Sequence, residues 1–536
     1  MPPTPVLNVI CLLATLLMPI AGLAAPGADV GDASTPDIAG EHAKVPQVGG
    51  PERVTDWWRA GQAFIRRSEH IQPIHGKAKN VILFIGDGMG ISTITAARIL
   101  EGQLRGEPGE ENSLFFETLP YVALSKTYSW DQQTPDSAPT MTAMMTGYKT
   151  RDGMLSIDHA TARGECDADT VASHALPTLL EQAAMAGKST GIVSTARITH
   201  ATPAATYAHT PDRDWEGDAM MPAGCGVKDI SRQLVELSPT VMASLKVALG
   251  GGREFFMMST QADPEYPGHV GARRDGRDLI RAWLASRNGL AAGSQYVWNK
   301  AGFEQVDPRK TPYLLGLFEP SHMQWEADRL KDVAGEPSLS EMTTKSLKML
   351  EREAHGFFLM VEAARIDHAH HAGNAKRALL DTIELAHAVK AAYAMTDPRE
   401  TMIIVTADHG HVFTIAGYPH RGNPILGLVS PVPAQDGHAP VPARDVHGLP
   451  YTTLNYVNGP GAGGQASAGA RLDPGAVDTT ADNYRQQALV PLSSETHSGE
   501  DVAIYASGPK AYLVHGTMEQ NWIYHVMRAA FGWTAE

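Results

Sequence analysis

The stretch 356-GFFLMVEAARIDHAHHAGN-374 begins as an apolar run and then changes abruptly into acids and histidines. Residues 357–361 have the length and composition of a buried strand. Glu362 stands where this strand ends, and Asp367 and His371, four positions apart, would share one face of a following helix. Burying these groups together is costly without a cation, so the stretch predicts a divalent metal site. A solvated polar start of a helix is the competing interpretation for any single histidine.

The same pattern recurs along the chain, because other apolar runs are also followed by a polar or Gly-rich turn and a helical pattern. The runs are 81-VILFI-85, 191-GIVST-195, 357-FFLMV-361 and 402-MIIVT-406. Apolar strands that alternate with helices indicate an α/β fold with a large, mostly parallel central sheet flanked by helices. Such sheets place their chemistry beyond the carboxyl ends of the strands, which is where the polar residues of this chain stand.

The N-terminal region and one internal segment differ in composition from the predicted core. Residues 1–24 form an apolar run that resembles a secretory signal peptide without the usual basic residue, and an uncleaved membrane anchor is the alternative. Residues 25–55 predict a flexible leader. The core would comprise 56–428 and 491–536, and the Gly-, Pro- and Ala-rich segment 429–490 predicts an inserted surface subdomain. We therefore expect an exported protein, either periplasmic or secreted.

Charge and cysteine content narrow the class further. The chain has 44 Lys and Arg against 59 Asp and Glu, which disfavours non-specific nucleic-acid binding. Once the signal is removed, only Cys166 and Cys225 are left, and this even number in an exported chain predicts one disulfide rather than two free buried thiols. Residues 527–536 contain no apolar tail, so we expect no stable membrane span after signal cleavage.

Two further segments carry candidate functional residues, one after a predicted strand and one at the start of a predicted helix. The turn 86-GDGMG-90 matches neither a dinucleotide fingerprint nor a phosphate loop, so Asp87 is predicted to be a ligand where glycines allow a close backbone approach, with a structural turn as the alternative. In 136-DSAPTMTAMMTG-147, Ser137 would lie at a helix N-terminus suited to an anion, although such a serine alone is more often a cap. No catalytic-triad pattern accompanies Ser137, and a zinc ion bound to its oxygen would activate it instead.

The segment 198-ITHATPAATYAHTPDRDW-215 adds donors and a cation. His200 and Thr202 alternate in position, so an extended segment would point both side chains the same way. Arg213 offers a planar fork that matches two phosphate oxygens, and a surface salt bridge is its alternative role.

The end of the chain supplies a second set of donors. Asp408 and His409 follow the strand at 402–406, and His497 follows the insert. His368 and His370 fall on other faces of the helix after 361 and are either support for the ligands or merely polar. The candidate donors are Asp87, Asp136 or Ser137, His200, Thr202, Glu362, Asp367, His371, Asp408, His409 and His497. This number exceeds the needs of one ion, and the mixture of imidazole and oxygen donors suits zinc together with magnesium.

Six motifs run through these segments: GDGMG, DSAPTMTAMMTG, THATPAATYAHTPDRDW, VEAARIDHAHH, TADHGHVF and ETHSGEDVA. In order and spacing they resemble the motifs of the alkaline phosphatase family, from about Asp56 to the C-terminus. The segments 249-LGGGREF-255 and 418-YPHRGNPILG-427 resemble the branch that includes the animal enzymes. The resemblance implies a metal-dependent phosphate monoester hydrolase of broad substrate range that forms a phosphoserine and releases inorganic phosphate.

The resemblance also implies a role for each candidate donor. Ser137 would be the phosphorylated nucleophile and Arg213 the phosphate clamp. Two zinc ions and one magnesium ion would be bound. Their implied ligands are Asp367, His371 and His497 for the first zinc, Asp87, Ser137, Asp408 and His409 for the second, and Asp87, Thr202 and Glu362 for magnesium, with His200 beside them.

Further features follow from the same resemblance. The branch often has a calcium site, and its members here would be Glu265, the carbonyl of Phe318, Glu319 and Glu336, although the loop before Glu336 is longer and carries Glu where Asp is usual. The pairing of Cys166 with Cys225 matches a family disulfide. Residues 57–65 resemble a helix that grips a second subunit, and the insert resembles a crown at the dimer interface, so a homodimer is expected.

Three other functions deserve comparison. A phosphodiesterase or nucleotide pyrophosphatase would usually present a threonine nucleophile and lack the segment around Arg213. A sulfatase needs a Cys/Ser-x-Pro-x-Arg sequence, which 136-DSAPT-140 does not contain. A non-catalytic exported metal- or phosphate-binding protein is the alternative outside the enzymes.

Overall fold

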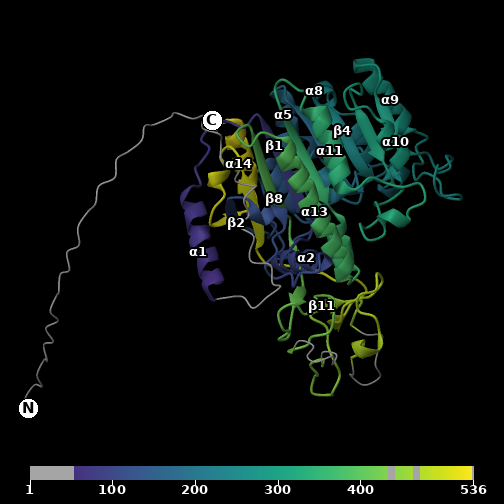
Figure 1. The fold of residues 1–536 in the computed structure, drawn as a ribbon. Coiled ribbons are helices and arrows are strands. Elements are labelled where there is room, and N and C mark those ends of the chain that lie inside the picture. The colour runs from purple at the N-terminus through teal and green to yellow at the C-terminus, as the bar shows by residue number, and fades with distance from the viewer. Residues whose placement is uncertain (1–53, 433–440, 463–470, 534–536) are drawn as a thin grey trace, which may run out of the picture. The chain divides into compact units, whose positions relative to one another are not determined.

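The computed structural model describes residues 54–432, 441–462 and 471–533 (Figure 1). The predicted signal peptide, 1–24, lies outside the described residues, as does the predicted leader except for its last two positions. Helix α1 (Val54–Glu69) begins at those two positions. Among the helices of the described ranges, none has the length and apolar character needed to cross a membrane.

A ten-stranded sheet lies at the centre of the described residues. In spatial order its strands are β15 (Thr517–Glu519), β2 (Tyr121–Lys126), β14 (Val502–Ser507), β8 (Thr401–Ala407), β1 (Asn80–Gly86), β7 (Phe357–Ala363), β3 (Ser189–Arg197), β4 (Leu245–Gly251), β6 (Leu314–Leu317) and β5 (Gln295–Val297). The strands from β8 to β5 are parallel, whereas β14 runs antiparallel to its two neighbours. The predicted α/β class is therefore confirmed.

The four apolar runs quoted above all lie within strands of this sheet, namely β1, β3, β7 and β8. Successive side chains of a strand point to opposite faces of a sheet. In β1, Val81 and Leu83 belong to one apolar cluster and Ile82 and Phe84 to the other, and all four are fully buried. Continuous apolarity along these strands thus reflects burial on both faces.

Helices cover both faces of the sheet. On the face of Ile82 lie α2 (Ile91–Leu104), α11 (Leu339–Leu350) and α13 (Ala375–Met395), of which the last two run side by side in Figure 1. The other face is covered by α3 (Ser137–Thr146), α5 (Leu179–Met185), α8 (Pro239–Ser244), α9 (Leu279–Leu290) and α14 (Trp522–Phe531). The remaining helices are α4 (Ala168–Ser173), α6 (Ala201–Ala204), α7 (Ile230–Val235), α10 (Lys300–Gln305) and α12 (Arg365–His371), with short 3-10 turns η1 (Phe115–Thr118), η2 (Asp218–Met220), η3 (Arg253–Phe256), η4 (Arg329–Lys331), η5 (Pro474–Ala476) and η6 (Ala511–Leu513).

Two small sheets lie outside the main one. The first consists of β10 (Phe413–Ile415), β11 (Leu454–Gly459) and β12 (Ala488–Pro491), and it includes most of the short strand expected at 451–457. The second pairs β9 (Gly410–His411) with β13 (His497–Ser498). The boundaries of the predicted insert, 429–490, remain a prediction, and 433–440 and 463–470 within it are outside the described residues.

Cys166 and Cys225 form a disulfide with their Cα atoms 4.8 Å apart. The pairing expected from the even number of cysteines is therefore confirmed. The bridge joins segments separated by 59 residues.

Candidate metal centre and active site

The carboxyl edge of three neighbouring parallel strands collects three carboxylates. In the register of the sheet, Gly86 of β1 lies opposite Ala407 of β8, so Asp87 and Asp408 follow at the same level. Glu362 stands one position before the end of β7, the other neighbour of β1. The side chains of all three acids are fully buried. The edge expected from the sequence to carry the chemistry is thus where these acids meet.

The position of Gly88, directly after Asp87, leaves no room for a side chain. Gly88 has φ +68°, and a Cβ there would lie 2.3 Å from Nε2 of His411. Its N–H donates a hydrogen bond to Oδ1 of Asp408 at 3.0 Å. A side chain at this position would push apart the groups that surround Asp87, which is why the turn is rich in glycine.

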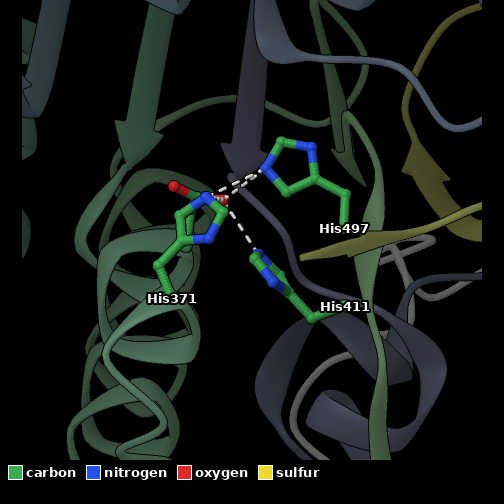
Figure 2. A group of neighbouring side chains, drawn as sticks. His371, His411 and His497 are labelled. Carbon is green, nitrogen blue, oxygen red and sulfur yellow. Dashed lines mark hydrogen bonds and ion pairs between the residues drawn. The ribbon is translucent and has the colours of Figure 1, made fainter. Parts of the chain in front are cut away.

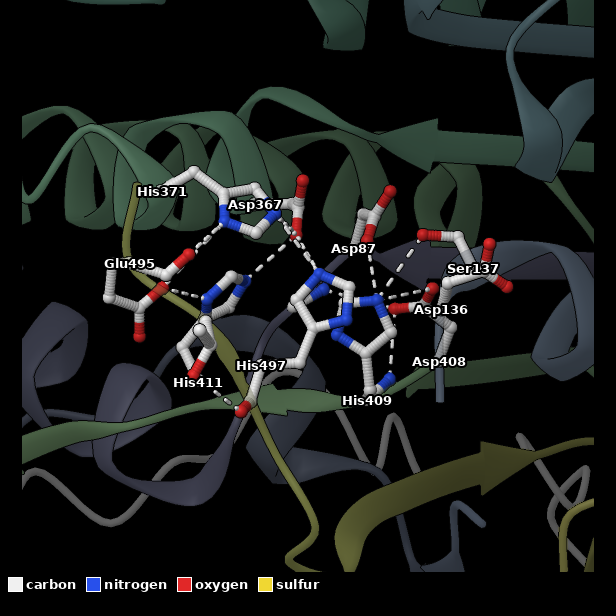
Figure 3. Close-up of polar contacts among 12 residues, drawn as sticks. Asp87, Asp136, Ser137, Asp367, His371, Asp408, His409, His411, Glu495 and His497 are labelled. Carbon is white, nitrogen blue, oxygen red and sulfur yellow. Dashed lines mark hydrogen bonds and ion pairs between the residues drawn. The ribbon is translucent and has the colours of Figure 1, made fainter. Parts of the chain in front are cut away.

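Three imidazoles, those of His371, His411 and His497, point towards one another (Figure 2), and Asp367 lies beside them (Figure 3). We call these four residues the imidazole-rich group. Asp367 Oδ1 lies 2.8 Å from Nε2 of His411, 3.2 Å from Nε2 of His497 and 3.4 Å from Nε2 of His371. Asp367 and His371 share one face of α12, as their spacing predicted. His497 reaches the group because β13 pairs with β9, opposite His411.

The second nitrogens of two of these rings face backbone oxygens. Nδ1 of His371 donates to the carbonyl oxygen of Glu495 at 2.6 Å, and Nδ1 of His497 donates to that of Pro135 at 2.8 Å. Their Nε2 atoms, 3.1 Å apart, therefore keep their lone pairs and point towards Asp367. This arrangement is typical of histidines that bind a metal through the other nitrogen.

His411 and Glu495 belong to the site, although the sequence analysis assigned them no role. Nδ1 of His411 lies 2.5 Å from Oε2 of Glu495, and both side chains are buried. Burial lowers the pKa of His411, but Glu495 and Asp367 raise it to about 10, so the ring is a cation between two carboxylates. A signal existed, because His411 follows His409 by two positions and Glu495 precedes His497 by two positions.

A second group surrounds the serine and comprises Asp87, Ser137, Asp408 and His409 (Figure 3). Nε2 of His409 lies 3.2 Å from Oγ of Ser137, 3.2 Å from Oδ2 of Asp408 and 3.5 Å from Oδ1 of Asp87. The ring of His409 stacks on that of His497 at 3.6 Å between centroids. Burial and the neighbouring His497 hold the pKa of His409 well below its usual value, so this imidazole is neutral.

Ser137 is the first residue of α3, and Asp136, not Ser137, caps this helix. Oδ1 of Asp136 accepts the N–H of Ala138 at 3.0 Å. The hydroxyl of Ser137 is thereby left to face His409, while the side chain as a whole is 2% exposed. The alternative in which the serine serves only as a cap is therefore wrong.

A third group brings Glu362 and Asp87 together with His200 and Thr202. One donor atom each from Asp87, His200 and Glu362 lies within 4.8 Å of the others. The expected extended segment is wrong, because His200 is the N-cap of the one-turn helix α6 and Thr202 lies within it. Burial raises the pKa of Glu362 to about 7, although the hydroxyls of Ser194, at 2.5 Å, and Thr202 lower it.

The carboxylates of this edge are short of hydrogen-bond donors. Within the part of the chain that the structure describes, both oxygens of Asp87 and Oε1 of Glu362 are buried without a hydrogen bond. Burial, and then the repulsion by Asp408, raise the pKa of Asp87 well above its usual value, and burial also raises that of Asp408. Buried acids in this arrangement fit bound cations, which would supply the missing positive charge.

Arg213 lies beside the serine in a loop after α6. Its Nη1 donates to Oδ2 of Asp136 and its Nη2 to Nε2 of His200, both at 3.0 Å. Burial would lower the pKa of Arg213, but Asp136 and Asp87 raise it, so the guanidinium stays charged. The charged guanidinium of Arg213 thus lies beside Asp136, which directly precedes Ser137.

A separate acidic cluster lies at the region expected to hold calcium. The structure brings Glu265 and Glu319 within 4.8 Å of Asp332, which the sequence analysis did not name. Glu336 lies near enough that Glu319 and Asp332, after burial, raise its pKa well above the usual value. Phe318 is buried directly before Glu319. The long loop before Glu336 therefore contributes an acid of its own.

A mostly parallel sheet whose carboxyl edge carries buried acids, imidazoles and a serine defines a metal-dependent hydrolase of the α/β class. The family model described as alkaline phosphatase matches residues 78–533, and the chain belongs to that family. It is a metal-dependent phosphomonoesterase, as the resemblance of its motifs implied.

Characterised relatives are similar over most of the chain. The alkaline phosphatase of Gadus morhua is 45% identical over 487 residues, which cover 90% of this chain and 97% of the relative. The tissue-nonspecific isozyme of Gallus gallus is 45% identical over 492 residues, covering 90% of each chain. The solved alkaline phosphatase of Thermus thermophilus, 24% identical, shares the fold with a TM-score of 0.60 over 87% of this chain and 93% of that one.

Proposed function

We propose that the protein hydrolyses a broad range of phosphate monoesters through a phosphoserine at Ser137, with two zinc ions and one magnesium ion. The observation that carries this proposal is the position of the Ser137 hydroxyl, 3.2 Å from Nε2 of His409 and between groups of metal donors. A buried serine without a histidine–aspartate relay needs cations to become a nucleophile. The surrounding acids and imidazoles are suited to hold them.

The proposed zinc ligands fit that ion by the chemistry of their donors. Asp367, His371 and His497 would hold one zinc ion, and the Nδ1–H bonds of both rings to backbone carbonyls support this assignment. The other zinc ion would be held by the second group, which consists of Asp87, Ser137, Asp408 and His409. His411 would support the first site through its bond to Asp367.

The proposed magnesium ligands are oxygen atoms of Asp87, Glu362 and Thr202, with His200 beside them. Hard oxygen donors suit magnesium, which binds few protein ligands and keeps several waters. The hydroxyl of Ser194 donates a hydrogen bond to Oε2 of Glu362, so Oε1 is the oxygen available to bind a metal ion. The high pKa of Glu362, about 7, supports a nearby cation that would keep the carboxylate ionised.

Bound zinc would stabilise negative charge on the attacking and leaving oxygens of an in-line displacement. Oγ of Ser137 forms a bond to phosphorus while the bond between phosphorus and the alcohol oxygen breaks. A water molecule then breaks the bond between Ser137 and phosphorus, which restores the hydroxyl and releases inorganic phosphate. Two displacements in sequence retain the configuration at phosphorus.

Arg213 would hold the phosphoryl group during both displacements. Its planar fork matches two non-bridging oxygens. The N-terminus of α3, where Ser137 is the first residue, adds backbone N–H groups that favour an anion. These groups would contact only the phosphate and the ester oxygen, so the reaction itself would accept a broad range of monoesters.

Assembly, calcium binding and export complete the proposal. Helix α1 exposes Trp58 by 71% and Phe64 by 59%, which supports a homodimer in which this helix contacts a second subunit and the insert 429–490 forms a crown.

Calcium would be bound by Glu265, Glu319 and the Phe318 carbonyl with Glu336, and Asp332 joins this cluster. The disulfide supports an exported, periplasmic or secreted enzyme with a core of 56–428 and 491–536.

A substrate panel run together with metal analysis tests the proposal. The purified protein is assayed with matched monoester, diester and sulfate-ester substrates, and its zinc, magnesium and calcium contents are measured. We expect a clear preference for the monoester and two zinc ions per chain. A preference for the diester or sulfate ester, or stoichiometric uptake of phosphate without turnover, would refute it.

A further inference from the structure

A second histidine cluster lies next to the proposed magnesium group. It consists of His200, His322 and His368, and one ring nitrogen of each lies within 4.8 Å of the others. The rings of His322 and His368 are 4.1 Å apart between centroids. All three residues are partly exposed. His322 appears in none of the motifs, so the sequence alone gave no sign of this cluster, which we call the arginine-bound cluster.

Each ring of this cluster accepts a hydrogen bond from an arginine. Arginine has only donors, so the ring nitrogen that faces it must be an acceptor. The pairs are Arg213 Nη2 with His200 Nε2 at 3.0 Å, Arg197 Nη1 with His322 Nε2 at 2.6 Å, and Arg365 Nη1 with His368 Nδ1 at 3.0 Å. In a neutral imidazole the other nitrogen then carries the proton. His200 and His368 therefore present N–H donors, whereas Nδ1 of His322 also faces a donor, the backbone N–H of Arg197 at 3.3 Å.

This polarity argues against a cation in the cluster. A histidine that binds a metal donates its other N–H to a carboxylate or a carbonyl, as His371 and His497 do. In the arginine-bound cluster the other nitrogen faces a donor instead. Nδ1 of His200 is buried and has no hydrogen-bond partner among the described residues. A negatively charged acceptor would satisfy these donors.

The charge of the surroundings points the same way. Arg197 is neutralised by a two-point contact with Glu216, whereas Arg365 has no carboxylate within ion-pair distance among residues 54–432, 441–462 and 471–533. Arg365 is 8% exposed and stacks on Trp325 with its guanidinium carbon 3.8 Å from the ring centroid. It is thus a cation beside His368 that Asp381 and Glu336 attract only from beyond ion-pair distance.

We propose that His368 and Arg365, with His322 packed against His368, form an anion subsite that receives an acidic group on the leaving alcohol of the substrate. The inference rests on the proposed function, because Arg213, the proposed phosphate clamp, contacts His200 at the border of the cluster. A monoester that carries a second anionic group, such as a carboxylate or another phosphate, would place that group among these donors. Such esters form the preferred substrate class.

The test compares phosphoglycolate with its amide, phosphoglycolamide, on the zinc- and magnesium-loaded enzyme. The two esters differ only in whether the second group is a carboxylate or a carboxamide. We expect His322→Asp, which places a carboxylate beside His368, to reduce the preference for phosphoglycolate, expressed as the ratio of the two kcat/KM values, by at least about tenfold, because like charges repel. The change should lie in KM rather than kcat. His322→Asn, which adds no charge, should retain most of the ratio.

His355→Asp is the matched control, because His355 is exposed and precedes β7 at the end opposite the site. This variant should leave the ratio unchanged. A ratio that His322→Asp does not alter would overturn the inference, as would the loss of one metal ion per chain in His322→Ala. If the wild-type enzyme hydrolyses neither ester, the proposed function itself fails.

A measurement on the wild-type enzyme covers the case in which His322→Asp does not fold. Phosphonoacetate and phosphonoacetamide are compared as competitive inhibitors. The subsite predicts that the carboxylate inhibits more strongly than the amide by about tenfold or more. Equal inhibition by the two compounds would refute the subsite.

Discussion

The imidazole-rich group and the arginine-bound cluster contain three histidines each, yet they are opposite in polarity. In the first, His371 and His497 donate to backbone carbonyls and keep their lone pairs for a cation. In the second, arginines occupy one nitrogen of each ring, and His200 and His368 keep an N–H for a ligand. The number of histidines therefore does not determine what a cluster binds. The second contact of each ring does.

The two clusters would complement each other around one substrate. The chain as a whole is acidic, with a formal net charge of −15, whereas a phosphate monoester is a dianion. Cations held by the imidazole-rich and Ser137 groups would neutralise the reacting phosphate, and the arginine-bound cluster would neutralise charge on the alcohol. Positive charge is thus gathered at one edge of the sheet, where it attracts the substrate.

Of the four changes predicted here, removal of the metal ions should have the largest effect on activity. Thorough chelation should reduce activity to background and lower the thermal midpoint, because Asp87, Asp408 and Glu362 would be left as neighbouring buried acids. Zinc and magnesium added together should restore both properties. Activity and calorimetry before and after chelation measure this.

The control for chelation is His322→Ala, which alters only the arginine-bound cluster. Its zinc content should equal that of the wild type. Activity that survives complete chelation would contradict the assignment of the imidazole-rich group to a metal.

Replacing the proposed nucleophile comes next in size. Ser137→Ala should lower kcat by several orders of magnitude, because the oxygen that forms the covalent intermediate is lost. Inhibition by inorganic phosphate should remain measurable, since Arg213 and the other metal donors are intact. Steady-state kinetics and phosphate titration give both values. Turnover near that of the wild type would rule out a phosphoserine at this position.

Replacing His411 tests whether the imidazole-rich group and the arginine-bound cluster differ in metal binding. His411→Phe removes a ring that holds both Asp367 and Glu495, and it should weaken zinc binding by roughly 10–100-fold, as expected for a residue that orients a metal ligand. Competition with a chromogenic chelator measures the affinity. His322→Phe is the matched change in the other cluster and should leave zinc affinity unaltered. Equal losses of zinc affinity in the two variants would show that the two clusters do not differ in metal binding.

Arg213 should show the smallest effect of the four. Arg213→Ala removes the phosphate clamp and should raise KM and the inhibition constant of phosphate by about tenfold or more, with a lesser change in kcat because the metals remain. Arg163→Ala is a suitable control, since Arg163 pairs with Asp212 and Asp214 on the same loop. An unchanged affinity for phosphate would show that Arg213 does not hold it.

The sequence predicted most of the elements that carry the site. Apolar runs located β1, β3, β7 and β8, because a strand buried on both faces must be apolar throughout. The spacing of Asp367 and His371 predicted α12, because residues four apart share a helical face. These signals are local, so they can be read from short segments.

The rest depended on contacts between distant segments. His411 acquires its role only when β13 pairs with β9 and Glu495 approaches from beyond the insert. His322 has no periodic or motif signal, and its position beside His368 follows from the packing of the loop after β6. Asp332 joins the acidic cluster through a loop whose path the sequence did not define.

Anomalous diffraction at the zinc absorption edge, from crystals of the metal-loaded enzyme, tests the central claim most directly. The account predicts two zinc peaks, one bounded by Asp367, His371 and His497 and the other by Asp87, Asp408, His409 and the oxygen of Ser137. A peak among His200, His322 and His368, or no peak beside Ser137, would contradict it.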